Sequence, residues 1–184
     1  MKKLLVVVMI FFALGMGCFA NAQTTLDGLW IDADLNADIP LNDDLDTTLY
    51  ISGSLGYDIN PYLAIYAEAG WREFDFSDID ADVTSVPLLL NARYTFLPDA
   101  QWSPYIFGGL GISLNDISSS GVEIDDSFAA QIGGGVEYRL NDALAVYGES
   151  RIFFSDPDTS VTLLGQESLD LNSISIGGGV RFDF

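Results

Sequence analysis

Apolar and polar residues alternate along most of the chain after residue 27. In the stretch 104–115, for example, Ile106, Leu110 and Ile112 occupy one set of alternate positions, whereas Tyr105 and Ser113 occupy the other. Because successive side chains of a β-strand point to opposite faces, this period of two predicts strands with one apolar face. Eight such stretches occur, at about 28–37, 47–57, 62–74, 84–96, 104–115, 127–140, 143–154 and 173–184.

The connections between these predicted strands alternate in length. The short ones follow the second, fourth and sixth stretches and cover 58–61, 97–103 and 141–142. The longer, acidic ones follow the first, third, fifth and seventh stretches and cover about 38–46, 75–83, 116–126 and 155–172. Short turns at one end and long loops at the other are typical of transmembrane β-barrels. With an even number of strands, both termini lie at the short-turn end, which we expect to face the periplasm.

Charged residues distinguish a membrane barrel from a soluble one. In the phases of these eight stretches, the apolar face carries no charge. Such a face would be a liability in water, whereas a charge facing lipid near the bilayer midplane costs about 2–4 kcal/mol. We therefore predict an all-β fold, an eight-stranded antiparallel up-and-down transmembrane β-barrel, with its apolar face toward lipid and its charged face toward the lumen.

Aromatic residues gather at the ends of the predicted strands. Those at the short-turn end are Tyr57, Tyr62, Tyr94, Phe96, Trp102, Tyr138, Phe182 and Phe184. Those at the loop end are Trp71, Phe128 and Phe154. Two aromatic belts are typical of proteins that cross a bilayer, because aromatic side chains favour the membrane–water interfaces.

Residues 1–22 have the layout of a cleaved export signal. Lys2 and Lys3 form a short basic segment, and residues 4–17 are apolar without a charge. Ala20-Asn21-Ala22 then provides a cleavage site of the A-x-A type. The apolar run is too short for a comfortable membrane span, so we predict a signal peptide that is removed.

Removal of the signal leaves 23–184 as one predicted barrel domain. Two other interpretations of the N-terminal segment remain open. Cys18 is a candidate lipoprotein site, although Gly15 stands where such sites usually have a Leu-like residue. The segment is alternatively an uncleaved anchor helix.

Composition excludes several classes of function. After residue 22 the chain has 27 acidic residues, five arginines and no lysine, a formal charge of −22. It also has no histidine, and its single cysteine, Cys18, lies in the predicted signal. These counts exclude nucleic acid as a partner, as well as His-based triads, His or Cys metal sites and Cys nucleophiles. We predict that the protein is not an enzyme and has no cofactor and no metal site.

Three segments of the chain resemble a known family. They are SPYIFGGLGIS, the pair FAAQIGGGVEYRL–NDALAVYGES, and the closing SISIGGGVRFDF. These segments are similar to the small outer-membrane β-barrel family, including the transmembrane barrel of outer membrane protein A and its short relatives. The resemblance implies a location in the cell outer membrane. It also implies that Val180, Phe182 and Phe184 form the signal that the barrel-assembly machinery reads. The peptidoglycan-binding domain of outer membrane protein A is not expected here, because the chain stops at the last predicted strand.

The charged residues of the predicted strands gather in the predicted lumen. Polar-face positions carry Glu68, Arg72, Arg93, Glu137, Arg139, Glu149, Arg151, Arg181 and Asp183. A lumen of eight strands is just wide enough to be filled by side chains, so these arginines need carboxylate partners. From strand adjacency we predict the pairs Arg139–Glu149 and Glu137–Arg151. Inward glycines would make room for them, at 109, 111, 133, 135, 177 and 179.

The acidic loops offer a second candidate site. Asp78, Asp80 and Asp82 have the spacing of a calcium-binding loop. Val83 and Leu89 replace the glycine and the glutamate that an EF-hand needs at its sixth and twelfth positions, so an EF-hand is excluded. The loops are then either a solvated, repulsive surface or weak sites for divalent cations that bridge to lipopolysaccharide phosphates.

Two classes of function remain open. The first is an integral outer-membrane protein with a structural or surface-interaction role, a lumen filled by Arg/acid ion pairs, and acidic extracellular loops. The alternative is a narrow, low-conductance porin-like channel for ions or small solutes, in which the same pairs act as a gate. In both cases we expect a monomer in contact with outer-membrane lipid and lipopolysaccharide.

Overall fold

The computed structural model describes residues 27–41, 46–75, 82–117, 122–124, 126–155, 158–161, 165–168 and 172–184. Eight long strands are β1 (Leu29–Pro40), β2 (Thr48–Asn60), β3 (Leu63–Asp75), β4 (Asp82–Thr95), β5 (Trp102–Ile117), β7 (Ser127–Asn141), β8 (Leu144–Ser155) and β11 (Ser173–Asp183). Three short strands are β6 (Val122–Ile124), β9 (Asp158–Val161) and β10 (Gly165–Ser168). Over the described residues, no helix is long and apolar enough to cross a membrane. The predicted signal peptide lies outside these residues.

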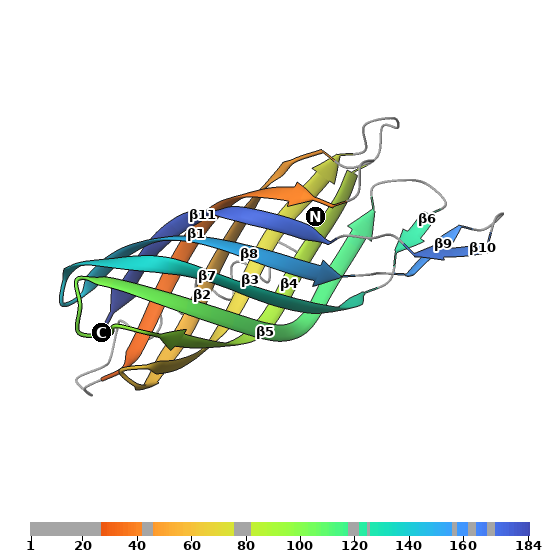
Figure 1. Ribbon diagram of the computed structural model, residues 1–184. Coiled ribbons are helices and arrows are strands. Elements are labelled where there is room, and N and C mark those ends of the chain that lie inside the picture. The colour runs from red at the N-terminus through yellow and green to blue at the C-terminus, as the bar shows by residue number, and fades with distance from the viewer. Residues whose placement is uncertain are drawn as a thin grey trace, which may run out of the picture.

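The eight long strands form a closed barrel in the order β1-β11-β8-β7-β5-β4-β3-β2 (Figure 1). All neighbouring pairs are antiparallel. The first and last strands close the barrel, with paired residues running from Trp30↔Asp183 to Pro40↔Ser173. The predicted fold class is therefore confirmed. Closure leaves the barrel no free sheet edge, which is the condition for a sheet to lie in a bilayer.

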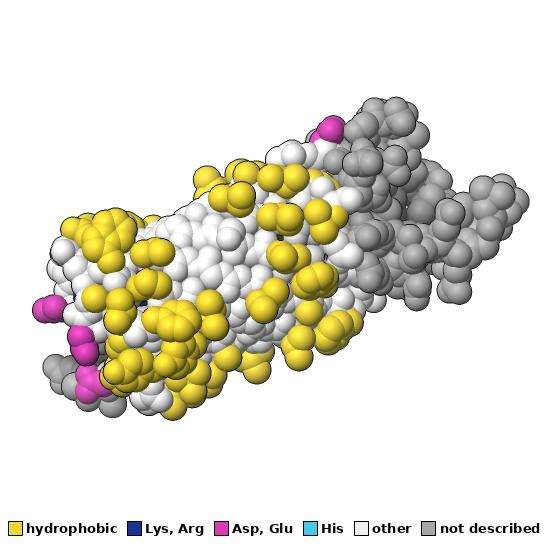
Figure 2. All heavy atoms as spheres, viewed as in Figure 1, with side chains coloured by type: hydrophobic (Ala, Val, Ile, Leu, Met, Phe, Trp, Pro, Cys, Tyr) yellow, Lys and Arg dark blue, Asp and Glu magenta, His cyan; other side chains and the backbone are white. Residues whose placement is uncertain are grey.

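The strands have an apolar outer face and an inner face that carries the buried charged side chains, as their period of two predicts. Leu110 and Ile132 point outward and are 60 % and 59 % exposed, whereas Glu68 points inward and is 3 % exposed. Hydrophobic side chains are spread over much of the visible flank of the barrel, and acidic side chains appear at its ends (Figure 2). Val86 departs from the prediction, because it belongs to the apolar face and yet is 5 % exposed.

Aromatic side chains occupy the outer surface at the predicted strand ends. Trp102 packs on Tyr138 with ring centroids 4.5 Å apart, and Tyr94 meets Phe96 edge-on at 5.2 Å. The exposed members are Tyr57, Tyr62, Tyr94, Phe96, Trp102, Phe128, Phe154, Phe182 and Phe184. Trp71 and Tyr138 are half-buried.

Polar side chains close the short turns. Asn60 Oδ1 accepts hydrogen bonds from the backbone N–H groups of Tyr62 and Leu63, between β2 and β3. Asn141 Oδ1 likewise accepts from the backbone N–H of Ala143, between β7 and β8. Asparagine side chains commonly stabilise such turns through these local bonds. The short connections therefore have sequences suited to tight reversals.

The prediction that the longer connections contain only loops is wrong for two of them. Strand β6 lies in the connection after β5, and strands β9 and β10 lie in the connection after β8. They form a separate three-stranded sheet in the order β10-β9-β6, beyond the loop end of the barrel (Figure 1). Strands of three or four residues are too short to show a reliable period of two.

Of the three candidate calcium-loop residues, the structure describes only Asp82. Asp78 and Asp80 lie outside the described residues. Asp82 is the first residue of β4, and its backbone pairs with Asp75 of β3. The expectation of weak divalent binding therefore stays a prediction.

Candidate functional site

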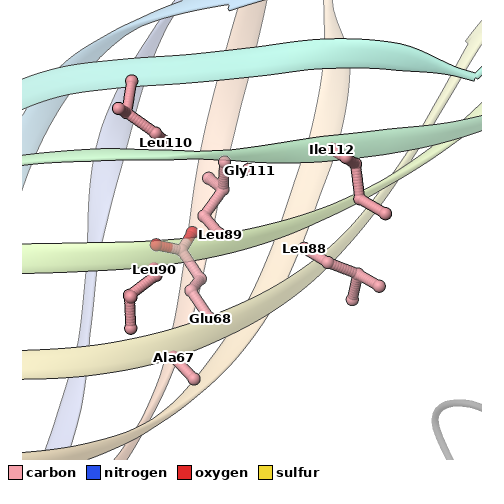
Figure 3. Close-up of a pocket in the computed structure, with 8 residues that line it drawn as sticks. All are labelled: Ala67, Glu68, Leu88, Leu89, Leu90, Leu110, Gly111 and Ile112. Carbon is pink, nitrogen blue, oxygen red and sulfur yellow. The ribbon is translucent and has the colours of Figure 1, made fainter.

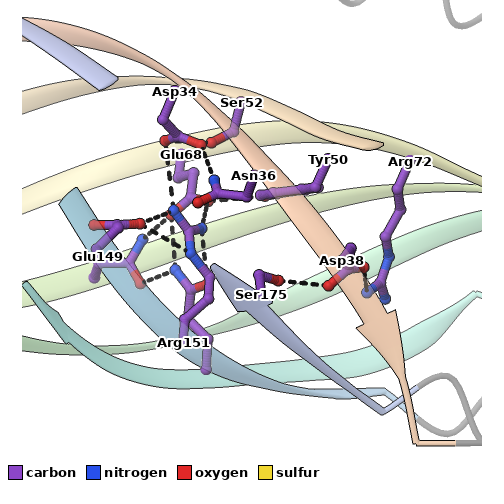
Figure 4. A network of polar contacts seen from close by, with 12 residues as sticks. Asp34, Asn36, Asp38, Tyr50, Ser52, Glu68, Arg72, Glu149, Arg151 and Ser175 are labelled. Atoms are coloured by element: carbon purple, nitrogen blue, oxygen red, sulfur yellow. Dashed lines mark hydrogen bonds and ion pairs between the residues drawn. The ribbon is translucent and has the colours of Figure 1, made fainter. Parts of the chain in front are cut away.

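The centre of the lumen is organised around one arginine. Arg151, on β8, is 4 % exposed. Its guanidinium donates to Glu68 Oε1 on β3 at 2.5 Å and to Asp34 Oδ2 on β1 at 3.4 Å. It also donates to Gln131 Oε1 on β7 at 3.2 Å and forms an ion pair with Glu149, two residues away on its own strand. One cation therefore joins four strands across the lumen (Figure 4).

Glu68 is the buried acceptor that completes this central cluster. The Tyr50 hydroxyl on β2 donates to Glu68 Oε1 at 2.8 Å. Asn91 Nδ2 on β4 and Gln131 Nε2 on β7 donate to Glu68 Oε2 at 3.2 and 2.7 Å. Arg151 and Glu68 together thus connect six of the eight barrel strands. Buried polar networks of this kind are stable only when their members are paired, as these are.

The loop end of the lumen has its own buried ion pair. Arg72 Nη1, on β3, lies 3.0 Å from Asp38 Oδ2 on β1, and both side chains are 1 % exposed. The guanidinium also donates to Ser173 Oγ on β11 at 3.0 Å. Its Cζ lies 4.1 Å from the ring centroid of Phe153 and 5.0 Å from that of Phe74. Paired with a carboxylate and stacked against aromatic rings, this charge is well accommodated away from water.

The turn end of the lumen contains two arginines and three acids. Arg93 Nη2 lies 2.7 Å from Glu137 Oε2. Arg181 Nη2 lies 2.7 Å from Asp58 Oδ2 and 2.5 Å from Asp183 Oδ1. Arg181 Nη1 also lies 3.9 Å from the Glu137 carboxylate, which joins the two groups. These pairs form a second charged layer near the short turns.

A layer of aromatic side chains separates the central cluster from the turn end. It consists of Trp30, Tyr66, Tyr105, Phe107 and Tyr147, all buried. The Cζ atom of Arg93 lies 3.7 Å from the ring centroid of Tyr105, and that of Arg181 lies 4.4 Å from that of Trp30. The Tyr105 hydroxyl donates to Glu149 Oε2 at 2.8 Å. Charged and aromatic layers therefore follow one another along the lumen in direct contact.

Glycines on the neighbouring strands make room for the large side chains of β8. Gly133 of β7 is paired with Arg151, and Gly135 of β7 is paired with Glu149. On the other side, Gly177 of β11 is also paired with Glu149. These three belong to the six inward glycines singled out in the sequence.

The structure brings eight of the nine predicted lumen residues into ion pairs. They are Glu68, Arg72, Arg93, Glu137, Glu149, Arg151, Arg181 and Asp183. Arg139 is the exception, because it is exposed and donates to the carbonyl of Pro98 at 3.0 Å. The β7–β8 register shifts between Arg139 and Asn141, next to the β7–β8 turn.

Neither of the two predicted pairs is formed. Glu149 pairs with Arg151 rather than with Arg139. Glu137 accepts a hydrogen bond from Arg93 and forms a longer ion pair with Arg181, rather than pairing with Arg151. The prediction assumed that partners lie on adjacent strands. An arginine is long enough to reach across a narrow lumen, so the opposite wall competes with the neighbouring strand.

Sequence analysis missed three acidic partners in this network. Asp34 contacts Arg151, Asp38 pairs with Arg72, and Asp58 pairs with Arg181. For Asp34 and Asp38 a signal exists, since the alternation of β1 continues through both. The sequence predicts a loop at Asp38, but β1 extends to Pro40. The sequence predicts a turn at Asp58, and no local pattern distinguishes this residue from other acidic residues in turns.

The residues of the predicted assembly signal lie on the outer face of the last strand. Val180, Phe182 and Phe184 are 47 %, 42 % and 38 % exposed. The rings of Phe182 and Phe184 meet edge-on with centroids 5.4 Å apart. Their recognition by the barrel-assembly machinery stays a prediction.

Comparisons with known proteins agree with this architecture. The chain matches a family model described as the outer membrane protein β-barrel domain over residues 9–182. No curated protein sequence matches it. The crystal structure of Neisserial surface protein A is similar with a TM-score of 0.69 and 17 % identity, over 86 % of this chain and 98 % of that chain.

Two further solved structures share the fold. The crystal structure of OprG from Pseudomonas aeruginosa gives a TM-score of 0.66 at 14 % identity, over 89 % of this chain and 99 % of that chain. The solution structure of E. coli outer membrane protein W gives 0.60 at 14 % identity, over 88 % and 100 %. The family model spans nearly the whole chain, and the described residues form a closed eight-stranded barrel. This chain therefore belongs to the outer membrane protein β-barrel family, whose members reside in the cell outer membrane.

Proposed function

We propose that this protein is an outer-membrane barrel with a closed lumen, which acts through its surface in a structural or surface-interaction role. The observation that carries the proposal is the position of Arg151, whose guanidinium contacts Asp34, Glu68, Gln131 and Glu149 from four strands. An aromatic layer adjoins this cluster on the turn side. Ions that follow the barrel axis would have to displace both layers.

Planar bilayer conductance of the refolded protein tests this proposal. We expect no discrete conductance steps from the wild-type barrel. Arg151→Gln removes the central charge and is expected to produce measurable steps, whereas Arg139→Gln, at an exposed arginine, leaves the barrel silent. Heat-modifiable gel migration verifies that each variant is folded. Discrete steps from the wild type itself would instead support the narrow-channel alternative.

A second candidate function is lateral passage of small apolar molecules through the barrel wall. The specific observation is Pro87, in β4, which has no N–H to donate to a neighbouring strand. Pairing of β3 with β4 runs as far as Ala69↔Leu88 and resumes only at Arg72↔Ser85. The gap therefore spans two positions of each strand.

Apolar side chains adjoin this gap on both sides of the wall, and the buried polar pair Arg72–Ser85 lies at its edge in the lumen. On the outside lies a hollow of about 350 Å³, lined by Ala67, Leu88, Leu90, Leu110 and Ile112 among others (Figure 3). On the inside, Leu89 packs in a buried cluster with Ala129 and Phe153. Trp71 occupies one of the unpaired β3 positions, and its buried Nε1 has no hydrogen-bond partner among the described residues. A local opening here would break few strand-to-strand bonds.

Binding of the apolar fluorophore N-phenyl-1-naphthylamine tests the lateral route. Pro87→Val supplies the missing N–H group and is expected to reduce saturable binding of the fluorophore to the refolded barrel. Pro104→Val, at a proline of β5 where pairing with β7 is continuous, serves as the matched control. Equal fluorophore binding by the wild type and both variants would remove this candidate.

A further inference from the structure

The turn end of the lumen opens into a polar cavity of about 240 Å³. Its walls come from the start of β1, the β7–β8 hairpin and the end of β11, where the C-terminus lies (Figure 1). Arg181 and Glu137, only 7 % and 5 % exposed, form part of its lining. The cavity therefore lies at the mouth of the barrel, next to the charged layer of the turn end. The proposed functions do not involve this cavity.

Most of the charges around this cavity are already neutralised within the protein. Arg181 is paired with Asp58 and Asp183 and lies near the Glu137 carboxylate. Glu137 is paired in addition with Arg93. These groups contribute to the electrostatic field in the cavity. A ligand that bound directly to one of them would have to break an existing ion pair.

Two lining residues of opposite charge are not neutralised. Arg139 and Asp142 both line the cavity and both are exposed. The guanidinium of Arg139 makes one hydrogen bond, to the carbonyl of Pro98. Of the five arginines, all within the described residues, Arg139 alone forms no ion pair. Asp142 likewise forms no ion pair with any described residue.

The hairpin holds these two charges apart. Arg139 and Asp142 lie three positions apart on one tight β7–β8 turn, yet they do not meet. The Asn141 side chain is engaged with the backbone N–H of Ala143, which fixes the turn between them. The C-terminal strand is tied to the same hairpin, because the Asp183 N–H donates to the Ala143 carbonyl at 3.0 Å. The separation of the charges is therefore a property of an anchored turn.

We infer that this cavity binds a small zwitterion, with a carboxylate of the ligand on Arg139 and an ammonium group on Asp142. A guanidinium offers a planar fork of donors that suits a carboxylate. An ammonium group is a compact donor that suits the carboxylate of Asp142. A simple anion would meet repulsion from the acidic lining, and a simple cation would leave Arg139 unpaired. Amino acids with one free carboxylate and one free amine therefore fit best.

Calorimetric titration of the refolded protein in detergent tests the inference. The probes are glycine, β-alanine, 4-aminobutyrate and 6-aminohexanoate, whose charges lie progressively further apart. Propionate and propylamine serve as single-charge controls. We expect saturable binding of at least one zwitterion below about 20 mM, and weaker binding of both single-charge compounds.

Matched variants locate the site. Arg139→Gln and Asp142→Asn are each expected to weaken zwitterion binding at least tenfold. Asp99→Asn removes an exposed turn acid that does not line the cavity and is expected to leave binding unchanged. Both tested side chains are exposed, and gel migration verifies that each variant folds. The inference is overturned if no zwitterion binds saturably, if propylamine binds as tightly, or if the two cavity variants bind like the wild type.

Discussion

Arg72 and Asp38, 34 positions apart in the chain, form an ion pair of 3.0 Å with both side chains 1 % exposed. The pair ties β3 to β1 across the loop end of the lumen, and Asp38 also accepts from the Ser175 hydroxyl at 2.5 Å. Removing one partner of a buried ion pair is typically destabilising by about 3–5 kcal/mol. We predict that Asp38→Asn lowers the free energy of unfolding by this amount in a urea titration of the refolded barrel.

A matched control separates this effect from a general loss of negative charge. Asp142→Asn removes the same charge from an exposed turn, outside any ion pair with the described residues. Surface substitutions of this kind usually change stability by less than about 0.5 kcal/mol. If Asp38→Asn and Asp142→Asn unfold at the same urea concentration, the pair contributes no stability and the prediction is wrong.

Gly56 is expected to be intolerant of any side chain. The Trp30 ring lies directly over it, and a Cβ built at residue 56 would meet ring atoms at 2.1–2.5 Å. The indole is held in place, because Trp30 Nε1 donates to Asp58 Oδ1 at 3.0 Å. Overpacking of a filled interior costs about 1–3 kcal/mol, and a contact this short lies at the upper end. We predict that Gly56→Ala lowers the urea midpoint of unfolding strongly.

Gly148 is the corresponding control. It lies in β8, and a Cβ there would come no closer than 3.8 Å to the nearest atom, the Gly177 carbonyl oxygen. Replacing a glycine by alanine without strain stabilises a protein by about 0.4–1 kcal/mol, because the unfolded chain loses freedom. Gly148→Ala should therefore be neutral or slightly stabilising. A loss of stability in Gly148→Ala equal to that in Gly56→Ala would show that the Trp30 contact is not the cause.

Loss of the central cation, Arg151, should destabilise the barrel more than loss of one of its carboxylate partners. Arg151 contacts three carboxylates, those of Asp34, Glu68 and Glu149. Arg151→Gln leaves all three without their shared partner, whereas Glu68→Gln leaves the arginine with two. We predict that Arg151→Gln costs about 3–5 kcal/mol and that Glu68→Gln costs clearly less. Urea unfolding of the two variants in parallel measures the difference, and equal losses would contradict it.

The barrel could be predicted from the sequence because its solvent is apolar. Because lipid surrounds the barrel and charged side chains fill its lumen, apolar and polar residues must alternate along each strand. Leu110 accordingly faces outward and Glu68 faces the lumen. The end of β1 is harder to predict, because Asp38 begins an acidic segment whose sequence is typical of a loop. Its burial depends on Arg72, which the local pattern around Asp38 does not contain.

Partners in the lumen could not be predicted for the same reason. The alternation shows that Arg151 faces inward, but it does not show which wall the guanidinium reaches. The pairing of β6 with β9 is a similar case, since Glu123 and Ser160 are opposite each other although they are far apart in the chain. Local periodicity determines faces, whereas long side chains and distant strands determine contacts.

The lipid-facing surface leads to a prediction that depends on depth in the bilayer. Ile132 and Leu140 lie on the same strand, β7, and are 59 % and 50 % exposed on the outer face. Ile132 is in the middle of the strand, whereas Leu140 is beside the β7–β8 turn. An arginine facing lipid costs about 2–4 kcal/mol at the midplane and about 0–1 kcal/mol near the interface.

We therefore predict that Ile132→Arg is destabilised by about 2–4 kcal/mol and Leu140→Arg by at most about 1 kcal/mol. Unfolding by urea from phospholipid vesicles measures both values. The same pair of variants in detergent micelles should show a smaller difference, because a micelle deforms more easily around a charge. Equal destabilisation of the two variants in vesicles would mean that residue 132 does not face the hydrocarbon core, and the placement of the barrel in the membrane would have to be revised.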